Sequence, residues 1–371
     1  MRVDSARRLK KKLQVSYAFQ TNGILLDKNW TALFRNYHFL VGLSFDGTDR
    51  LHDRYRVGPN GEKTAARVQA AWDLLCAEKV DTNLLCVVTG PMAKNPEKVY
   101  RYLRRMGAGF WQFIPCMGTA VDEPVAVAVE TPPSVKKTPN SSDPVGVPPM
   151  VRSIPHLDAP VDVPPIGGNV SHSDDSVDAS SMVKNAPLRS LDWTLEPKDY
   201  AYFLKGMFDL WYQEWKRGHY VSIRNFDDYI HLLCGGNASA CAACGDCGGY
   251  LAVEHDGSVY PCDFYVEDRW CLGNIYDSSM DELRYGDKML EFLDETRQFH
   301  QNSHRCEACE FYRLCKGGCK HDAEPGFAGV KSALKESTNI FCDAFRDFFR
   351  YAMPRMVEIA QAEMRYLDNV K

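Results

Sequence analysis

The chain has 371 residues, of which 45% are hydrophobic and 25% are charged, and its formal net charge is −5. This length excludes a mini-protein with one small core and allows two or three domains. No run of 18 apolar residues occurs, and the charge is weakly negative, so we expect neither a membrane nor a nucleic-acid partner. The most informative count is that of the 14 cysteines, because 11 of them fall between Cys234 and Cys342.

The N-terminal segment is basic but lacks the apolar stretch and the cleavage site of a secretory signal. We therefore expect a cytoplasmic protein. Thiols stay reduced in that compartment, where a dense group of cysteines binds metal more often than it forms disulfides.

Residues 16–117 alternate between short apolar runs, typical of strands, and segments in which apolar residues recur at helical spacing. The strands are expected at 17–20, 38–44, 82–89 and 109–116, with helices around 68–76 and 99–106. This alternation predicts an α/β fold with a parallel sheet or barrel. The chemistry of such folds lies at the C-terminal ends of the strands, where Ser44 and Met117 are found.

Residues 118–192 have a different composition, with 12 of the 20 prolines and no Phe, Tyr, Trp or Cys. Such a segment buries too little apolar surface to fold, so we expect a disordered insertion that acts as a spacer. Beyond it, apolar periodicity predicts a long packed helix over 196–217, and further helices over 280–293 and 341–367. An Asp-Gly turn predicts a hairpin over 251–262.

The cysteines of the C-terminal part form two groups. One group comprises Cys241, Cys247 and Cys262, and the other is the run Cys306-x2-Cys309-x5-Cys315-x3-Cys319, followed by Cys342. Thiolates suit both tetrahedral zinc and iron–sulfur clusters. The spacing alone leaves an iron–sulfur site, a zinc site and a set of disulfides open.

The whole pattern, Cys-x9-Gly-x4-Cys, then Cys-x2-Cys-x5-Cys-x3-Cys and a last Cys, resembles the seven-cysteine SPASM domain of radical S-adenosylmethionine (radical SAM) enzymes. Within that group, the segments 19–23, 43–47, 85–89, 221–224, 256–265, 272–275 and 313–319 resemble anaerobic sulfatase-maturating enzymes. The resemblance implies an incomplete (β/α) radical SAM barrel over 1–117, the insertion over 118–192, the last barrel helix and a connection over 193–233, and a small α+β SPASM domain with a C-terminal helix over 234–371.

The resemblance also implies a reaction, in which a 5′-deoxyadenosyl radical starts the oxidation of a Cys or Ser of a sulfatase to formylglycine. It implies two auxiliary [4Fe-4S] clusters, the first on Cys241, Cys247, Cys262 and Cys319 and the second on Cys306, Cys309, Cys315 and Cys342. Asp263 would be the base, and Ser44 and Met117 would contact S-adenosylmethionine. We expect a monomer with two partners, a sulfatase polypeptide and an electron donor.

The chain departs from this family in one respect. The Cys-x3-Cys-x2-Cys motif that holds the radical-generating [4Fe-4S] cluster does not occur in the 371 residues, and the resemblance begins at Tyr17, about where a third barrel strand is expected. The chain as written is therefore expected not to cleave S-adenosylmethionine, either because it is a fragment or because it is a degenerate relative. The alternatives are a catalytically silent iron–sulfur electron-transfer or binding module, a zinc-binding interaction protein, and another SPASM peptide-modifying enzyme.

Several other residues are expected to have lesser roles. Cys76 and Cys86 lie on apolar faces and are expected to be buried packing residues. Cys244 lies between two of the implied ligands and could compete with them. His304 and His321 flank the second group and are expected to form hydrogen bonds near the cluster rather than to ligate it.

Overall fold

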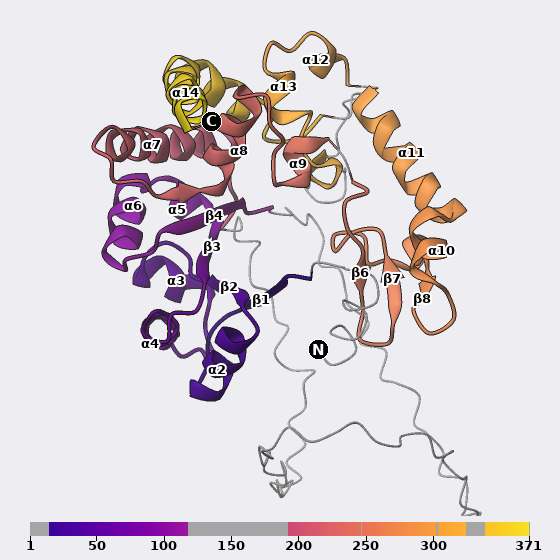
Figure 1. Cartoon of the computed structure of the whole chain (residues 1–371), viewed down its shortest axis with the longest axis horizontal. Helices are drawn as coiled ribbons and strands as arrows, with labels where there is room; N and C mark the ends of the chain where they lie inside the picture. Colours follow the sequence, from indigo (N-terminus) through magenta and orange to yellow (C-terminus); the bar gives the residue numbers. More distant parts are fainter. Residues whose placement is uncertain (1–14, 118–191, 246, 302, 324–337, 371) are drawn as a thin grey trace, which may run out of the picture. The chain divides into compact units, whose positions relative to one another are not determined.

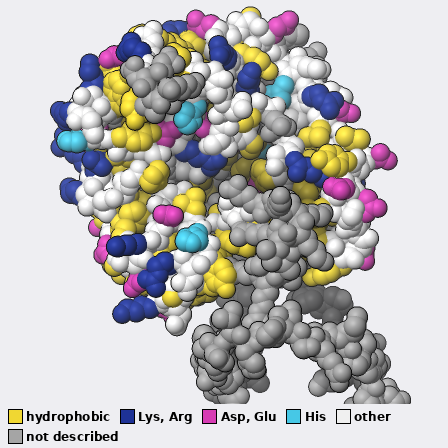
Figure 2. Space-filling model, in the orientation of Figure 1, with side chains coloured by type: hydrophobic (Ala, Val, Ile, Leu, Met, Phe, Trp, Pro, Cys, Tyr) yellow, Lys and Arg dark blue, Asp and Glu magenta, His cyan; other side chains and the backbone are white. Residues whose placement is uncertain are grey.

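The computed structural model describes residues 15–117, 192–245, 247–301, 303–323 and 338–370 (Figure 1). The predicted insertion over 118–192 therefore lies outside the described residues except for Asp192. Among the described residues, no helix combines the length and the apolarity that a membrane span requires. Figure 2 shows acidic and basic side chains interspersed on the displayed face, as expected for a chain of small net charge.

The N-terminal half is built on a parallel sheet with the strand order β1-β2-β3-β4-β5. Its strands are β1 (Tyr17–Thr21), β2 (Phe39–Ser44), β3 (Thr82–Val88), β4 (Phe110–Pro115) and β5 (Ser222–Ile223). The first four confirm the predicted strands. The fifth, with only two residues, was not predicted, and it joins β4 through Ser222 and Ile223 although about a hundred residues separate the two strands in the sequence.

One face of this sheet is covered by helices. The helices of this half are α2 (Lys28–Asn36), α3 (Asp49–Tyr55), α4 (Ala65–Ala77), α5 (Gly90–Ala93), α6 (Pro96–Arg105), α7 (Pro197–Lys216), α8 (Arg224–Leu233) and α14 (Cys342–Val370). Along β2 and β4, Val41, Leu43 and Trp111 are buried, whereas their neighbours Leu40 and Phe110 are exposed. This alternation is that of a strand with one covered face.

The long helices α7 and α14 confirm the helices predicted over 196–217 and 341–367. Their buried rings share one apolar core with the sheet, and Phe208 of α7 packs edge-on against Phe348 of α14. The same pair of helices is tied at the surface, where Arg355 and Tyr351 of α14 both bind the Asp209 carboxylate of α7. Because α14 begins at Cys342, it therefore attaches the cysteine-rich C-terminal part, which starts at Cys234, to the core of the N-terminal half.

The cysteine-rich part contains short elements around a three-stranded antiparallel sheet, in the order β6-β7-β8. The elements are α9 (Cys241–Cys244), β6 (Ala252–Val253), β7 (Ser258–Tyr260), the 3₁₀ helix η2 (Asp268–Trp270), β8 (Gly273–Asn274), α10 (Met280–Tyr285), α11 (Asp287–Gln301), α12 (His304–Glu307), α13 (Tyr312–Cys315) and the 3₁₀ helix η3 (Lys320–Ala323). The predicted hairpin is confirmed by β6 and β7, with Gly257 in the left-handed region (φ 86°) at its turn.

The single helix predicted over 280–293 was wrong. A capping box between Ser279 and Glu282 starts α10 as expected, but the chain is extended at Gly286 (ψ 164°), and a second helix, α11, begins at Asp287. Apolar periodicity does not register this break, because Leu283 and Leu290 keep helical spacing across it.

Candidate functional site

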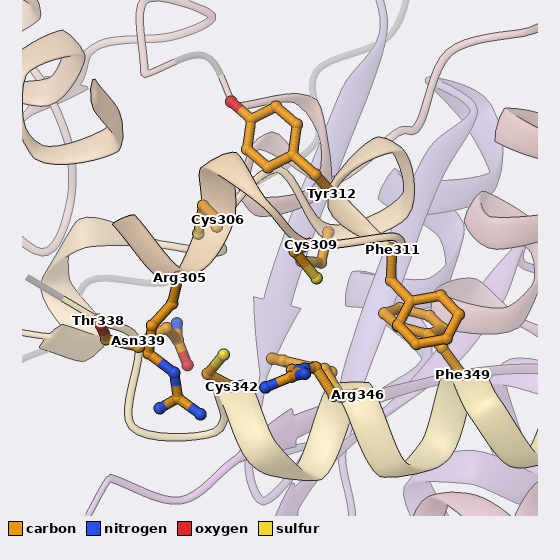
Figure 3. Close-up of a pocket in the computed structure, with 13 residues that line it drawn as sticks. Arg305, Cys306, Cys309, Phe311, Tyr312, Thr338, Asn339, Cys342, Arg346 and Phe349 are labelled. Carbon is orange, nitrogen blue, oxygen red and sulfur yellow. The ribbon is translucent and has the colours of Figure 1, made fainter. Parts of the chain in front are cut away.

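Four cysteines line one cavity between α12, α13 and the start of α14 (Figure 3). These are Cys306, Cys309, Cys315 and Cys342, and the remaining wall comes mainly from aromatic rings, from Asn339 and from Arg305 and Arg346. None of the 14 cysteines forms a disulfide. Figure 3 shows the side chains of Cys306, Cys309 and Cys342 facing a common space.

The four thiols of this cavity are close neighbours. Burial, with the nearby Cys306, Cys309 and Cys342, raises the pKa of the Cys315 thiol to about 11, so the four sulfurs lie close enough to influence one another. Within the described residues, no three His, Cys, Asp or Glu side chains converge on one metal-ion position. Thiolates bind both tetrahedral zinc and iron–sulfur clusters, so the cavity alone does not choose between the two.

Cys319 leaves this group although it follows Cys315 by only four residues. Between them, Lys316, Gly317 and Gly318 all adopt left-handed backbone conformations, with φ of 50°, 87° and 76°. Three such residues in succession reverse the chain, and two of them are glycines because a side chain there is strained. The Cys319 thiol is half-buried, and that burial raises its pKa to about 12, with smaller contributions from Asp322 and then from Cys247 and Cys241.

The second group therefore comprises Cys319, Cys247 and Cys241, with Cys262 nearby. Cys247 and Cys262 pack against the same small aromatic core, formed by Tyr265, Trp270 and Phe292. Cys241 is exposed, at the first residue of α9. The structure thus groups Cys306, Cys309, Cys315 and Cys342 around one cavity and places Cys319 near Cys247 and Cys241, while the two ligand sets that the resemblance implies stay a prediction.

The approach to Cys241 is fixed by a buried carboxylate that the sequence did not single out. Asp228 of α8 accepts hydrogen bonds from the backbone N–H groups of Ser239 (2.7 Å) and Ala240 (3.1 Å). Arg224 of the same helix donates to the Ser239 side chain and carbonyl, and also to Gln112 of β4. The start of α8 therefore connects the sheet to the segment that precedes Cys241.

Asp263 lies beside Cys262, with one carboxylate oxygen 3.4 Å from the Cys262 sulfur. The Tyr250 hydroxyl donates a hydrogen bond to the same oxygen at 2.6 Å. Burial, followed by the bond to Asp263, raises the pKa of Tyr250, so this hydroxyl keeps its proton at neutral pH. Asp263 itself is exposed, which leaves it accessible to a substrate.

Comparison with known proteins agrees with this geometry. The model of the SPASM family, an iron-sulfur cluster-binding domain, matches residues 241–310. A cysteine-type anaerobic sulfatase-maturating enzyme of Clostridium perfringens is 33% identical over 94% of this chain and 75% of its own length. The chain belongs to the anaerobic sulfatase-maturating enzyme family. A serine-type member from Bacteroides thetaiotaomicron is 25% identical over 92% of this chain and 69% of its own length.

The solved structures of this family match as well. The structure titled native anSMEcpe with bound AdoMet and Cp18Cys peptide has a TM-score of 0.73 and 32% identity, and covers 100% of this chain and 81% of that one. The fold class is therefore confirmed as the parallel α/β fold of the radical SAM enzymes followed by an iron–sulfur SPASM domain. The family match also decides among the three possibilities for the cysteines in favour of iron–sulfur clusters.

In the barrel part of this chain, Ser44 and Met117 lie at the same edge of the sheet. Ser44 is the last residue of β2 and is half-buried, and Met117 follows β4, where it packs against the core. Since the strands are parallel, both residues lie at the C-terminal edge, which is where such folds place their ligands. No direct contact between them is found among the described residues.

The remaining cysteines and histidines have ordinary surroundings. Cys86 is buried as predicted and donates to the Phe45 carbonyl at 2.8 Å, but Cys76 is exposed, because it lies near the end of α4 on the solvent side. Cys244 donates to the Ala238 carbonyl at 3.2 Å, which ties it into its own loop. His321 is buried and stacks on Phe264, with ring centres 4.4 Å apart, while the side chain of His304 lies outside the described residues.

Lys320, next to Cys319, is a buried cation that the sequence did not single out. Its ammonium group lies 3.9 Å from the centre of the Phe292 ring and within 5.5 Å of the Tyr265 and Trp270 rings, and 3.8 Å from Glu295. Contacts of this kind stabilise a desolvated cation. They attach η3, and with it Cys319, to the aromatic core on which Cys247 and Cys262 pack.

Proposed function

We propose that this chain binds two auxiliary [4Fe-4S] clusters, the first through Cys241, Cys247, Cys262 and Cys319 and the second through Cys306, Cys309, Cys315 and Cys342. The observation that carries the proposal is the cavity lined by Cys306, Cys309, Cys315 and Cys342, from which Cys319 is separated and lies near Cys247 and Cys241 instead. We also propose the boundaries that the resemblance implies, with the barrel part over 1–117, the insertion over 118–192, the last barrel helix and connection over 193–233 and the SPASM domain over 234–371.

The reaction that these residues suit is the oxidation of a Cys or Ser of a sulfatase to formylglycine. When bound, S-adenosylmethionine and its own cluster supply a radical that removes a hydrogen atom from the substrate Cβ, and the auxiliary clusters supply an acceptor for one electron. Ser44 and Met117 would hold the S-adenosylmethionine. The Asp263 carboxylate would take the proton from the substrate thiol or hydroxyl, which is the work of a general base.

The products balance for both substrates. Loss of one hydrogen atom, one proton and one electron converts a serine CH–OH group directly to an aldehyde. The same losses convert a cysteine to a thioaldehyde, and water then replaces sulfur to give the aldehyde and hydrogen sulfide. The chain would act as a monomer on a sulfatase polypeptide, and a separate electron donor would supply the reducing equivalents.

The 371 residues contain no Cys-x3-Cys-x2-Cys motif, so we propose that they do not generate the radical by themselves. The same observation favours a second candidate function, a catalytically silent iron–sulfur module that transfers electrons or binds a partner. The two differ in what an added motif would do. Upstream residues that supply the motif would restore turnover in the first case and would have no effect in the second.

The test has two stages. The chain, reconstituted anaerobically with iron and sulfide, is expected to hold about eight iron atoms and to show electron paramagnetic resonance signals of two reduced clusters. Zinc without iron or acid-labile sulfide would contradict the cluster assignment. A chain extended upstream to include the cysteine motif is then given S-adenosylmethionine, a reductant and a sulfatase peptide, and mass spectrometry reads whether the target residue becomes an aldehyde.

A further inference from the structure

Tyr250 lies in the segment between Cys247 and β6, beside the Cys262–Asp263 pair. Its hydroxyl oxygen is 2.6 Å from Asp263 Oδ1 and 3.2 Å from Cys262 Sγ. The Cys262 sulfur is in turn 3.4 Å from the same carboxylate oxygen. Three polar atoms from three residues thus form a closed triangle within hydrogen-bonding distance.

The role of Tyr250 depends on how many of these three groups can donate a hydrogen bond. A cysteine that ligates a cluster has lost its S–H hydrogen, and an ionised carboxylate accepts hydrogen bonds only. The Tyr250 hydroxyl is then the one donor among the three groups. Its contacts with Asp263 (2.6 Å) and with the Cys262 sulfur (3.2 Å) both lie within hydrogen-bonding distance, so its one hydrogen serves both acceptors, and the shorter contact is typical of a hydrogen bond to a charged acceptor.

We propose that Tyr250 is a positioning residue whose hydroxyl hydrogen lies between the Asp263 carboxylate and the Cys262 sulfur, where it offsets their negative charge and makes the cluster bound through Cys262 easier to reduce. The physical reason is that a reduced cluster carries more negative charge on its sulfurs, and hydrogen bonds to those sulfurs raise its reduction potential. The inference rests on the proposed function, in which Cys262 is a cluster ligand and Asp263 is the base.

The substitution Tyr250→Phe removes the hydroxyl and keeps the ring. Because Tyr250 is 41% exposed, loss of its hydroxyl leaves no buried cavity, and the iron content is expected to stay at the wild-type level. Loss of one ordinary hydrogen bond from the reduced state is expected to lower the ratio of reduced to oxidised cluster about fivefold at a fixed potential. With 59 mV for each factor of ten in a one-electron couple, the midpoint potential shifts by about 40 mV to more negative values.

Two further variants of the reconstituted 371-residue chain make the measurement specific. Cys262→Ser identifies which of the two clusters is bound through Cys262, because the resonance signal and potential of that cluster change. Tyr351→Phe is the matched control, since it removes a tyrosine hydroxyl that donates to Asp209 at 2.7 Å on the surface between α7 and α14. Potentials are read by redox titration followed with electron paramagnetic resonance.

The inference predicts that Tyr250→Phe shifts only the signal that Cys262→Ser alters, and that Tyr351→Phe shifts neither signal. An unchanged potential in Tyr250→Phe, with the signal still altered by Cys262→Ser, overturns the role of Tyr250 and leaves the proposed function standing. If Cys262→Ser alters neither cluster, Cys262 is not a ligand, and the failure lies in the proposed function. Equal shifts of both clusters in Tyr250→Phe would also overturn the inference, because they would indicate a general structural change.

Discussion

The substitution Asp228→Asn tests whether the segment before Cys241 is held in place by one buried carboxylate. Asp228 is 3% exposed and accepts two backbone hydrogen bonds, at 2.7 and 3.1 Å. Asparagine keeps one accepting oxygen but places an NH₂ group where the other oxygen was, so one backbone N–H faces a donor. A hydrogen bond to a charged group contributes about 1.5–3 kcal/mol, and we take about 2 kcal/mol for its loss.

If the loss opens the turn at Ser239 and Ala240 locally, the open state becomes about 30-fold more populated. The assay is the release of iron to a chelator from the reconstituted chain, which is expected to occur in two phases, one for each cluster. The phase that belongs to the Cys241 cluster should become up to about 30-fold faster in Asp228→Asn, and the other phase should not change.

Asp227→Asn is the matched control for this experiment. Asp227 precedes Asp228 on the same helix, but its carboxylate accepts from the hydroxyls of Tyr220 and Ser222, away from the segment before Cys241. Its replacement should lower the global stability without accelerating one iron phase over the other. Equal acceleration of both phases in Asp228→Asn, or the same pattern in Asp227→Asn, would refute the reasoning that Asp228 acts through Cys241.

Three further outcomes are expected. In an enzyme completed with the cysteine motif, Asp263→Asn should keep its iron but form no aldehyde on a sulfatase peptide, and normal turnover would remove Asp263 from the base role. Gly318→Ala should lower the iron content of both clusters, because the φ of Gly318 is +76° and a Cβ there would lie 2.5 Å from Asn339 Nδ2. The control Gly249→Ala, which has open space around the added Cβ, should match wild type in the same iron assay. Burial raises the pKa of the Cys86 thiol above its ordinary 9.0. The contribution of Cys86 to stability is therefore complete below pH 9.0 and is lost as the pH rises. The free energy of unfolding, measured by urea titration, should fall more steeply above pH 9.0 in wild type than in Cys86→Ala.

Much of the fold could be predicted because its signals are local. Buried parallel strands appear as continuous apolar runs, and four of the five strands of the first sheet were found in this way. The fifth, Ser222–Ile223, is too short to leave a periodic signal and exists because the strand Phe110–Pro115 offers it an edge. The break at Gly286 was missed for the opposite reason, since the apolar pattern continues across it although the backbone does not.

The residues of the candidate site were likewise predicted only in part from the sequence. The cysteines could be picked out because they form spaced motifs, and Asp263 because the family resemblance implies its role, whereas Tyr250 and Asp228 act through hydrogen bonds to residues 11 to 13 positions away. Only the fold brings such partners together. A lone tyrosine after two glycines, or one of two adjacent aspartates on a helix, carries no pattern that separates it from a surface residue.

The spacing between Cys315 and Cys319 predicts the wrong site for Cys319, and the backbone between them explains why. A Cys-x3-Cys pair on a helix would place Cys315 and Cys319 on one face and so at one site. The left-handed turn at 316–318 sends Cys319 to the other group instead, and Asn339 secures it there by donating to the Cys319 carbonyl at 3.4 Å. The carbonyl of Asn339 also accepts from the backbone N–H of Cys342, a member of the cavity group. Asn339 thus contacts Cys319 through its side chain and Cys342 through its backbone carbonyl, and for this reason a change at Gly318, which a Cβ would press against Asn339, should affect both clusters together.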